Sequence, residues 1–364
     1  PQHVNPILRG VSDGLWGFMY DPDRRKYQLF TRRTPNLPRD VSLYESHDLV
    51  NWEDKGRILV GGDKDDGVFD HLQSMTPFIY ENFRMGLLNV NYSLPGAEYY
   101  EVYHKAPEDY PNQKFGIADI QLAYSRDGQS WLRPNERSPI VPAGEPGSPD
   151  AGMVFVPASN PIIRDGDTWI YYRAMRYRHN FWDLQAHIKQ CDGDMRDIQC
   201  AMLAKMPEDH WVSLDADSNE GSVVCKPWGP PHEIFVNADA QGGSIEAELV
   251  TPYGKVVPDY SRKDCIGVTA NGKNQQIKWK NGKNAWEAIG KDHLGGLLMK
   301  FYLKNAKLYS YTFTLPDSNG QLERDRLNAR WCEHIKHRSD NWDRNSNEPA
   351  IGIEPYTGPG PKDI

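Results

Sequence analysis

The sequence has no long apolar run, and its cysteines lack the spacing of a metal or redox centre. No stretch approaches the roughly 18 apolar residues that a membrane-spanning helix needs, so we expect no membrane partner. The five cysteines include no C-x-x-C pair, which argues against a zinc site or a dithiol centre, and we expect neither metal nor cofactor. Cys191 and Cys200 are candidates for a disulfide, which spacing alone does not establish.

An excess of positive charge is also missing. The chain of 364 residues carries 42 Lys and Arg against 50 Asp and Glu, a net charge of −8. This balance gives no global reason to bind nucleic acid, so no such partner is expected. No secretory signal is visible, and a start at Pro1 without Met is typical of a processed chain. We expect an extracellular or periplasmic protein, and the sequence does not indicate its oligomeric state.

Aromatic and turn-forming residues, by contrast, are abundant. Aromatics make up 11% of the chain, with 31 Gly and 27 Pro. This composition favours an all-β fold with surfaces that can stack on sugars, although an ordinary turn-rich β protein fits equally well.

A repeat organises residues 1–228. The pattern S-x-D-x-x-x-W occurs at residues 46–52 and 125–131, and three units of short strands with turn signals can be traced around it. Four strands per unit are typical of a propeller blade. The sequence therefore predicts a β-propeller of which three blades are visible, and further strands are needed to close the ring. In the motif we expect Ser and Asp to bond to nearby backbone amides and the Trp to pack between blades. Asp48 and Asp127 are then poor catalytic candidates.

The rest of the chain differs in pattern. Alternating apolar and polar residues over 229–315 predict an antiparallel β-sandwich, and residues 316–364 form a polar tail. The pattern assigns residues 222–225 and a degenerate turn at 208–211 to the third propeller unit.

Several stretches carry a resemblance to a known family. They are residues 121–131, residues 168–172 with His179, and Gly-Ser-Ile-Glu-Ala-Glu at 243–248. With them the chain resembles the five-bladed glycoside hydrolases of families 43, 32, 68 and 117, and is most similar to bacterial "family 32-like" proteins with a C-terminal β-sandwich. The resemblance implies cleavage of glycosidic bonds by two or three carboxylates in a funnel on the propeller axis. The N-D-P-N-G, R-D-P and E-C motifs of these families are absent.

Because those motifs are absent, we look for the catalytic carboxylates by their position relative to the strands of each unit. Asp13, Asp70 and Asp150 each precede the first strand of a unit, and equivalent positions in successive blades converge on the axis. Glycoside hydrolysis needs one group to assist water or attack the anomeric carbon and another to protonate the leaving oxygen. The alternative is that these residues only cap turns. Glu145 and His179 are candidates for the proton donor.

Substrate-binding candidates surround these carboxylates. His71 is a candidate contact for a sugar hydroxyl, and Trp16 a candidate for stacking on a pyranose ring. Arg32, Arg33, Arg173 and Arg176 lie at strand ends, where a forked guanidinium suits a carboxylate or sulfate. The expected partner is therefore a carbohydrate, with an acidic or sulfated sugar as one option. The alternative is that these arginines form salt bridges to the funnel carboxylates.

The leading hypothesis is a glycoside hydrolase, an enzyme of the glycosidase class, acting on a polysaccharide or oligosaccharide. A non-catalytic carbohydrate-binding protein is the second, because the catalytic motifs are missing. A polysaccharide lyase is the third; it needs a Tyr or His base and a charge-neutralising Arg. Fold alone does not decide between them, since propellers host unrelated functions.

Overall fold

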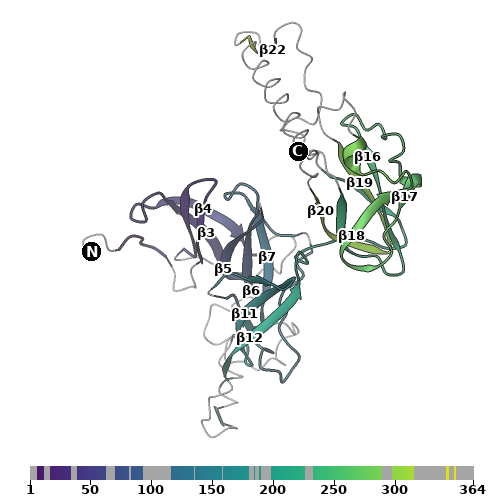
Figure 1. Cartoon of the computed structure of the whole chain (residues 1–364). Helices are drawn as coiled ribbons and strands as arrows, with labels where there is room; N and C mark the ends of the chain where they lie inside the picture. Colours follow the sequence, from purple (N-terminus) through teal and green to yellow (C-terminus); the bar gives the residue numbers. More distant parts are fainter. Residues whose placement is uncertain are drawn as a thin grey trace. The chain divides into compact units, whose positions relative to one another are not determined.

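The chain is described by a computed structural model, coloured along the sequence in Figure 1. It describes residues 6–11, 17–33, 39–62, 70–81, 83–92, 116–134, 136–157, 159–179, 198–225, 233–288 and 297–314, with short pieces at 184, 188–189, 342–343 and 348–349. The contacts divide the chain into two compact units, residues 1–208 and 209–364. Apart from two short 3₁₀ helices, every element with described bounds is a β-strand. None of the described helices is long and apolar enough to span a bilayer.

The first unit begins with a four-stranded antiparallel meander, in which each strand pairs with the next along the chain. Its strands are β1 (Gly17–Asp21), β2 (Lys26–Thr31), β3 (Asp40–Ser46) and β4 (Glu53–Val60). Along β1 every second residue is buried, as expected for a strand with one face against a core. We call this sheet the first meander.

A second meander repeats the pattern. It consists of β5 (His71–Tyr80), β6 (Phe83–Asn91), β7 (Ala118–Ser125) and β8 (Trp131–Leu132), each antiparallel to the next. Apolar side chains from both meanders form one core cluster, including Phe30, Leu43, Met75, Leu88 and Trp131. Gly17 lies so close to the Met75 carbonyl that a Cβ there would collide with it. The two meanders therefore pack face to face.

The third meander has three strands. Its first strand is broken into β9 (Met153–Phe155) and β10 (Ile162–Arg164), and both parts pair with β11 (Asp167–Met175), which also pairs with β12 (Gln199–Pro207). A single parallel bridge between Ala118 and Met153 joins it to the second meander. The first two meanders have the four-stranded connectivity of a propeller blade. The described strands of the first unit form one four-stranded and one eight-stranded sheet and no closed ring.

The second unit contains two sheets that share one core. One has the strand order β13-β20-β15-β18-β17 and the other β14-β19-β16. Val236 and Ile277 from the first sheet pack in the same buried cluster as Ile245 and Phe301 from the second. The strands are β13 (Leu214–Ala216), β14 (Gly221–Val224), β15 (Ile234–Asp239), β16 (Ser244–Val250), β17 (Cys265–Ile266), β18 (Asn271–Trp279), β19 (Leu298–Lys304) and β20 (Ala306–Phe313). The 3₁₀ helices are η3 (Arg262–Asp264) and η4 (Ala285–Ala288), and in the tail β21 (Trp342–Asp343) pairs with β22 (Glu348–Pro349).

The start of this unit differs from the sequence-based expectation. β13 pairs with β20 and β14 pairs with β19, so residues 222–225 belong to the second unit and not to the third meander. The degenerate turn behaves likewise, because Asp209 accepts a hydrogen bond from Ser310 and His210 stacks on Tyr309. Along the chain, the boundary between the two units consequently lies between residues 208 and 209, earlier than residue 228. Local sequence pattern indicates a strand here but not its partner.

The Ser and Asp of both S-x-D-x-x-x-W turns bond to nearby backbone amides, as predicted; Trp131 packs between meanders, whereas the ring contact of Trp52 is with Phe18 of its own meander. In the first turn the backbone amides of Val50 and Asn51 donate to Asp48 Oδ1, at 2.9 and 2.7 Å. In the second turn Asp127 Oδ1 accepts from the amides of Gln129 and Ser130, at 2.8 and 2.7 Å. The two serines accept backbone amides in the same way.

Candidate functional site

One end of the first unit gathers strand ends from all three meanders. The backbone amide of Leu72 donates to the Arg39 carbonyl at 3.1 Å, which joins the second meander to the first. The backbone amide of Gly116 donates to the backbone carbonyl of Tyr92 at 2.9 Å. The backbone amide of His179 donates to the backbone carbonyl of Gly116 at 2.6 Å, which joins the third meander to the second. We call this region the convergent end; its polar side chains are those of Arg32, Arg39, Asp70, His71, Tyr92, Asp119 and His179. It brings together four of the predicted site residues: Arg32, Asp70, His71 and His179.

The two histidines at the convergent end are neutral at pH 7. Burial lowers the pKa of His71 to about 4, and the positive charges of Arg39 and Arg32 act in the same direction. Burial, together with the same two arginines, lowers the pKa of His179 to about 4. A neutral imidazole suits a hydrogen-bonding or basic role better than storage of a proton for a leaving group. This weakens the case for His179 as the general acid near neutral pH.

Asp70 lies immediately before β5 and is 7% exposed. Its backbone carbonyl packs against Gly61, where a Cβ would collide with it. Burial raises the pKa of the Tyr92 hydroxyl, and the negative charges of Asp119 and Asp70 raise it further. Asp70 is therefore close enough to Tyr92 for its charge to be felt there, in an environment from which water is largely excluded.

Tyr92 belongs to a buried polar network that the sequence analysis missed. Its hydroxyl donates to Asp119 Oδ2 at 2.6 Å and accepts from Gln121 at 3.2 Å, while Arg133 donates to Gln121 at 2.6 Å. Asp119 and Gln121 lie on β7 and are 5% and 3% exposed. The signal that could have found them is two polar residues at alternating positions of an otherwise apolar strand, Ala118–Ser125.

Asp150 is held by its own loop and by β11. Its carboxylate accepts hydrogen bonds from Ser148 Oγ at 2.7 Å and from the Tyr172 hydroxyl at 3.0 Å. Burial and the bond to Asp150 raise the pKa of Tyr172 to about 12, so Tyr172 stays a donor. A Cβ at Gly144 would strike the Asp150 carboxylate, which explains the glycine there. Glu145 is exposed in the same loop, and its carbonyl accepts from the Ser148 amide.

The predicted arginines have different surroundings. Arg32 is 5% exposed at the convergent end, and its charge is felt by both histidines. Arg33 forms an ion pair with Asp54 on β4. Arg173 is exposed on β11 and lies 4.1 Å from the centroid of the Phe155 ring. Arg176 follows β11 and is half-buried.

Some of the predicted residues fall outside the described part of the chain. These are Asp13, Trp16 and Cys191. Cys200 is a free thiol. Within the described residues no three side chains of the kinds that bind metals lie together.

Comparisons with known proteins found similarity in structure but not in sequence. No family model matches the sequence, and no curated protein matches it either. A thermostable family-43 glycoside hydrolase aligns with 57% of this chain and 52% of its own, at 17% identity and a TM-score of 0.35. A family 117 glycoside hydrolase from the marine bacterium Zobellia galactanivorans aligns with 46% of this chain and 52% of its own, at 12% identity and a TM-score of 0.31.

The solved structures with this partial likeness do not all share one activity. An N-acetylgalactosamine deacetylase from F. plautii, in complex with blood group B trisaccharide, aligns with 55% of this chain and 51% of its own, at 15% identity and a TM-score of 0.33. The chain thus spans about half the length of these three structures. The likeness is partial, and it assigns no activity to this chain.

Proposed function

We propose that the protein is a glycoside hydrolase that acts on a polysaccharide or oligosaccharide, with its active site at the convergent end and a sugar bearing an acidic or sulfate group as substrate. The observation that carries the proposal is the position of Asp70. It is a buried carboxylate at the point where all three meanders meet, and its charge acts on the hydroxyl of Tyr92. Carboxylates held in such surroundings are the groups that hydrolyse glycosides.

The proposal assigns a role to each group. Asp70 is the carboxylate that assists water or attacks the anomeric carbon, and Asp13 and Asp150 are the other members of the acidic centre. Tyr92 and the neutral imidazoles of His71 and His179 are hydrogen-bond partners for sugar hydroxyls. Cleavage needs a second carboxylic acid that protonates the leaving oxygen, and Asp150 and Glu145 are the candidates for it.

One observation favours a second function, a polysaccharide lyase. A lyase removes a proton beside a sugar carboxylate with a neutral base while a cation neutralises that carboxylate. His71 and His179 are neutral at pH 7, and Arg32 and Arg39 are near both of them. Proton transfer to an imidazole and departure of the 4-linked sugar would leave an unsaturated product, which absorbs in the ultraviolet.

A single assay separates these functions. The wild-type protein, Asp70→Asn and Asp150→Asn are incubated with a panel of neutral, acidic and sulfated polysaccharides, and reducing ends and ultraviolet absorbance are both measured. Asp165→Asn serves as the matched control, because Asp165 lies in an exposed turn. Hydrolysis predicts new reducing ends without absorbance, lost in Asp70→Asn by a factor of at least about 100.

Other outcomes contradict the proposal. Absorbance that disappears in His71→Ala or His179→Ala would identify a lyase. Binding without turnover in every variant would identify a non-catalytic carbohydrate-binding protein. Full activity in Asp70→Asn would remove Asp70 from the chemistry.

A further inference from the structure

Arg173 is an exposed arginine without a carboxylate partner among the described residues. Its guanidinium lies instead over an aromatic ring, 4.1 Å from the centroid of Phe155, the residue opposite it on β9. Arg33, another predicted binding residue, is already paired with Asp54. In a protein with a net charge of −8, an exposed arginine that has no carboxylate partner in the described part of the chain is suited to bind an anion from outside.

Arg173 borders a shallow hollow that is open to solvent. The hollow has a volume of about 560 Å³ and is lined by residues of β9, β11 and β12, among them Phe155, Tyr171 and Gln199. Volumes of this size are typical of small-molecule sites. On its β12 side Arg173 faces Ala201, whose small side chain leaves the space open.

The side chains in this hollow combine aromatic and charged character. Tyr171 and Arg173 are two positions apart on β11 and so lie on the same face of the sheet, and Tyr171 is 52% exposed. An exposed ring provides a flat apolar surface for a pyranose, while the planar guanidinium can donate two parallel hydrogen bonds to a carboxylate or sulfate.

One residue that borders the hollow contacts a proposed catalytic residue on the other face of the sheet. Tyr172 lines the hollow, and the Tyr172 hydroxyl donates to Asp150 Oδ2 at 3.0 Å. Tyr172 itself is 7% exposed, so this contact is shielded from water. A sugar bound beside Tyr171 and Arg173 would lie on the opposite face of β11 from the Tyr172 side chain that holds Asp150.

We propose that the hollow around Arg173, Phe155 and Tyr171 is a binding subsite for a sugar that carries a carboxylate or a sulfate group. The subsite rests on the proposed function only in that its ligand is a carbohydrate. Arg173 supplies the charge-assisted hydrogen bonds, and Phe155 and Tyr171 supply the apolar surface.

The test uses three methyl glycosides that differ only at C6: the neutral galactoside, the galacturonide and the galactoside 6-sulfate, with the same three compounds in the gluco series. Binding to Asp150→Asn is measured by calorimetry and ligand-observed NMR, so that turnover does not interfere. We expect at least one anionic glycoside to bind about tenfold more tightly than its neutral counterpart, because hydrogen bonds to charged groups are worth more than neutral ones. The tighter of the two anions identifies the natural group.

Three substitutions separate the contributions. Arg173→Gln should abolish the preference for the anion and leave neutral binding unchanged. Phe155→Leu should weaken all glycosides alike while the preference remains. Arg164→Gln is the matched control, because Arg164 is an exposed arginine whose partner is the adjacent Asp165, and it should change neither.

Each remaining outcome decides the question. Equal binding of neutral and anionic glycosides to the parent protein overturns the subsite, as does a preference that survives in Arg173→Gln. A protein that cuts no polysaccharide but shows the Arg173-dependent preference would retain the subsite and lose the proposed hydrolase. A protein that cuts a polysaccharide but shows no such preference would retain the proposed hydrolase and lose the subsite.

Discussion

The turns at residues 46–52 and 125–131 share one sequence pattern and the same local hydrogen bonds, yet their tryptophans have different environments. Trp131 is 5% exposed and packs edge-on against Phe30 of the first meander, with ring centroids 5.2 Å apart. Trp52 is half-buried, and its ring contact is with Phe18, which is 51% exposed. The motif therefore determines the turn, while the neighbouring sheet determines how deeply the tryptophan is buried.

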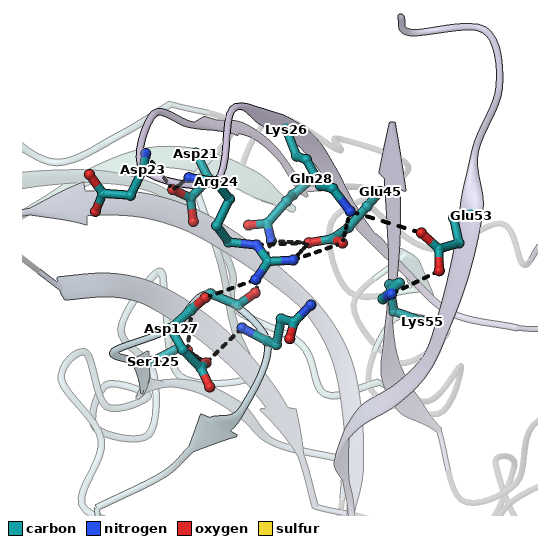
Figure 2. Close-up of polar contacts among 12 residues, drawn as sticks. Asp21, Asp23, Arg24, Lys26, Gln28, Glu45, Glu53, Lys55, Ser125 and Asp127 are labelled. Atoms are coloured by element: carbon teal, nitrogen blue, oxygen red, sulfur yellow. Dashed lines mark hydrogen bonds and ion pairs between the residues drawn. The ribbon is translucent and has the colours of Figure 1, made fainter. Parts of the chain in front are cut away.

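Polar contacts also fasten the second turn to the first meander, and Figure 2 shows the one between Arg24 and Asp127. Arg24 donates to the Asp127 carbonyl at 3.4 Å, and Gln28 donates to the Gly128 carbonyl at 2.8 Å. Arg24 and Gln28 in turn bond the carboxylate of Glu45. Beside them Arg84 reaches back to Asp21 with bonds of 2.5 and 2.8 Å. The second turn is thus part of an interface between meanders.

The largest expected difference in stability is between alanine variants of the two tryptophans. Trp131→Ala should lower the free energy of unfolding of the first unit by about 3 to 5 kcal/mol, because it leaves a cavity between the two meanders. Trp52→Ala should cost less than half as much, since its side chain is partly solvated in the native state. Urea unfolding of both variants measures the difference, and equal losses would mean that Trp52 is as well packed as Trp131.

Gly128 is the next point of contrast. Its φ is +73°, and a Cβ there would lie 2.5 Å from Asp21 Oδ2. Gly128→Ala combines a strained backbone with a collision against a buried carboxylate, so we expect a loss of about 2 kcal/mol. Thermal unfolding measures it, with Gly147→Ala as the control, because Gly147 has a φ of +93° and open space around it. A similar loss in both variants would show that the backbone alone is responsible.

The turn carboxylates should make stability depend on pH. Burial would raise the pKa of Asp127, but hydrogen bonds from the amides of Gln129 and Ser130 outweigh it and lower the pKa to about 2. A carboxylate with a lowered pKa stabilises the fold above its unfolded pKa, near 4, and loses that contribution as the pH falls towards 2. Allowing for screening by solvent, we expect the Asp127 carboxylate to contribute about 1 kcal/mol to the free energy of unfolding.

Asp127→Asn checks this dependence. Its deficit relative to wild type should be full at pH 6 and should shrink as the pH falls through 4 to 2. The pKa of Asp48 is also lowered, by the amide and side chain of Asn51, so Asp48→Asn should show the same direction. If the stability deficit of Asp127→Asn does not change with pH, the charge of the carboxylate is not what stabilises the turn.

The smallest expected effect is a gain in stability. Leu49 occupies the position of Gly128 in the first turn, with a φ of 66° and 43% exposure. Leu49→Gly relieves the left-handed conformation, worth about 1 to 2 kcal/mol, but adds freedom to the unfolded chain. We expect a net stabilisation of about 0.5 kcal/mol, measured by thermal unfolding. A loss of stability would indicate that the Leu49 side chain has a packing role.

The sequence was most informative where structure is local. The Ser and Asp of each turn bond to amides two or three residues away, so spacing alone predicts them. The sequence was least informative about which strands pair when they lie far apart along the chain. Residues 222–225 read correctly as a strand, but pairing with β19 depends on residues about 80 positions later. The network of Tyr92, Asp119 and Gln121 was missed for the same reason, because it is assembled from the adjacent strand ends of β6 and β7.

The pairing of β13 and β14 also has a consequence for the order in which the protein folds. The meanders pair strands that follow closely along the chain, so each can form soon after its last residue leaves the ribosome. β13 and β14 instead wait for β20 and β19, which end at residues 313 and 304. Such long-range closure is slow. During synthesis β13 and β14 therefore have no partner strand until the chain has been made as far as β19 and β20.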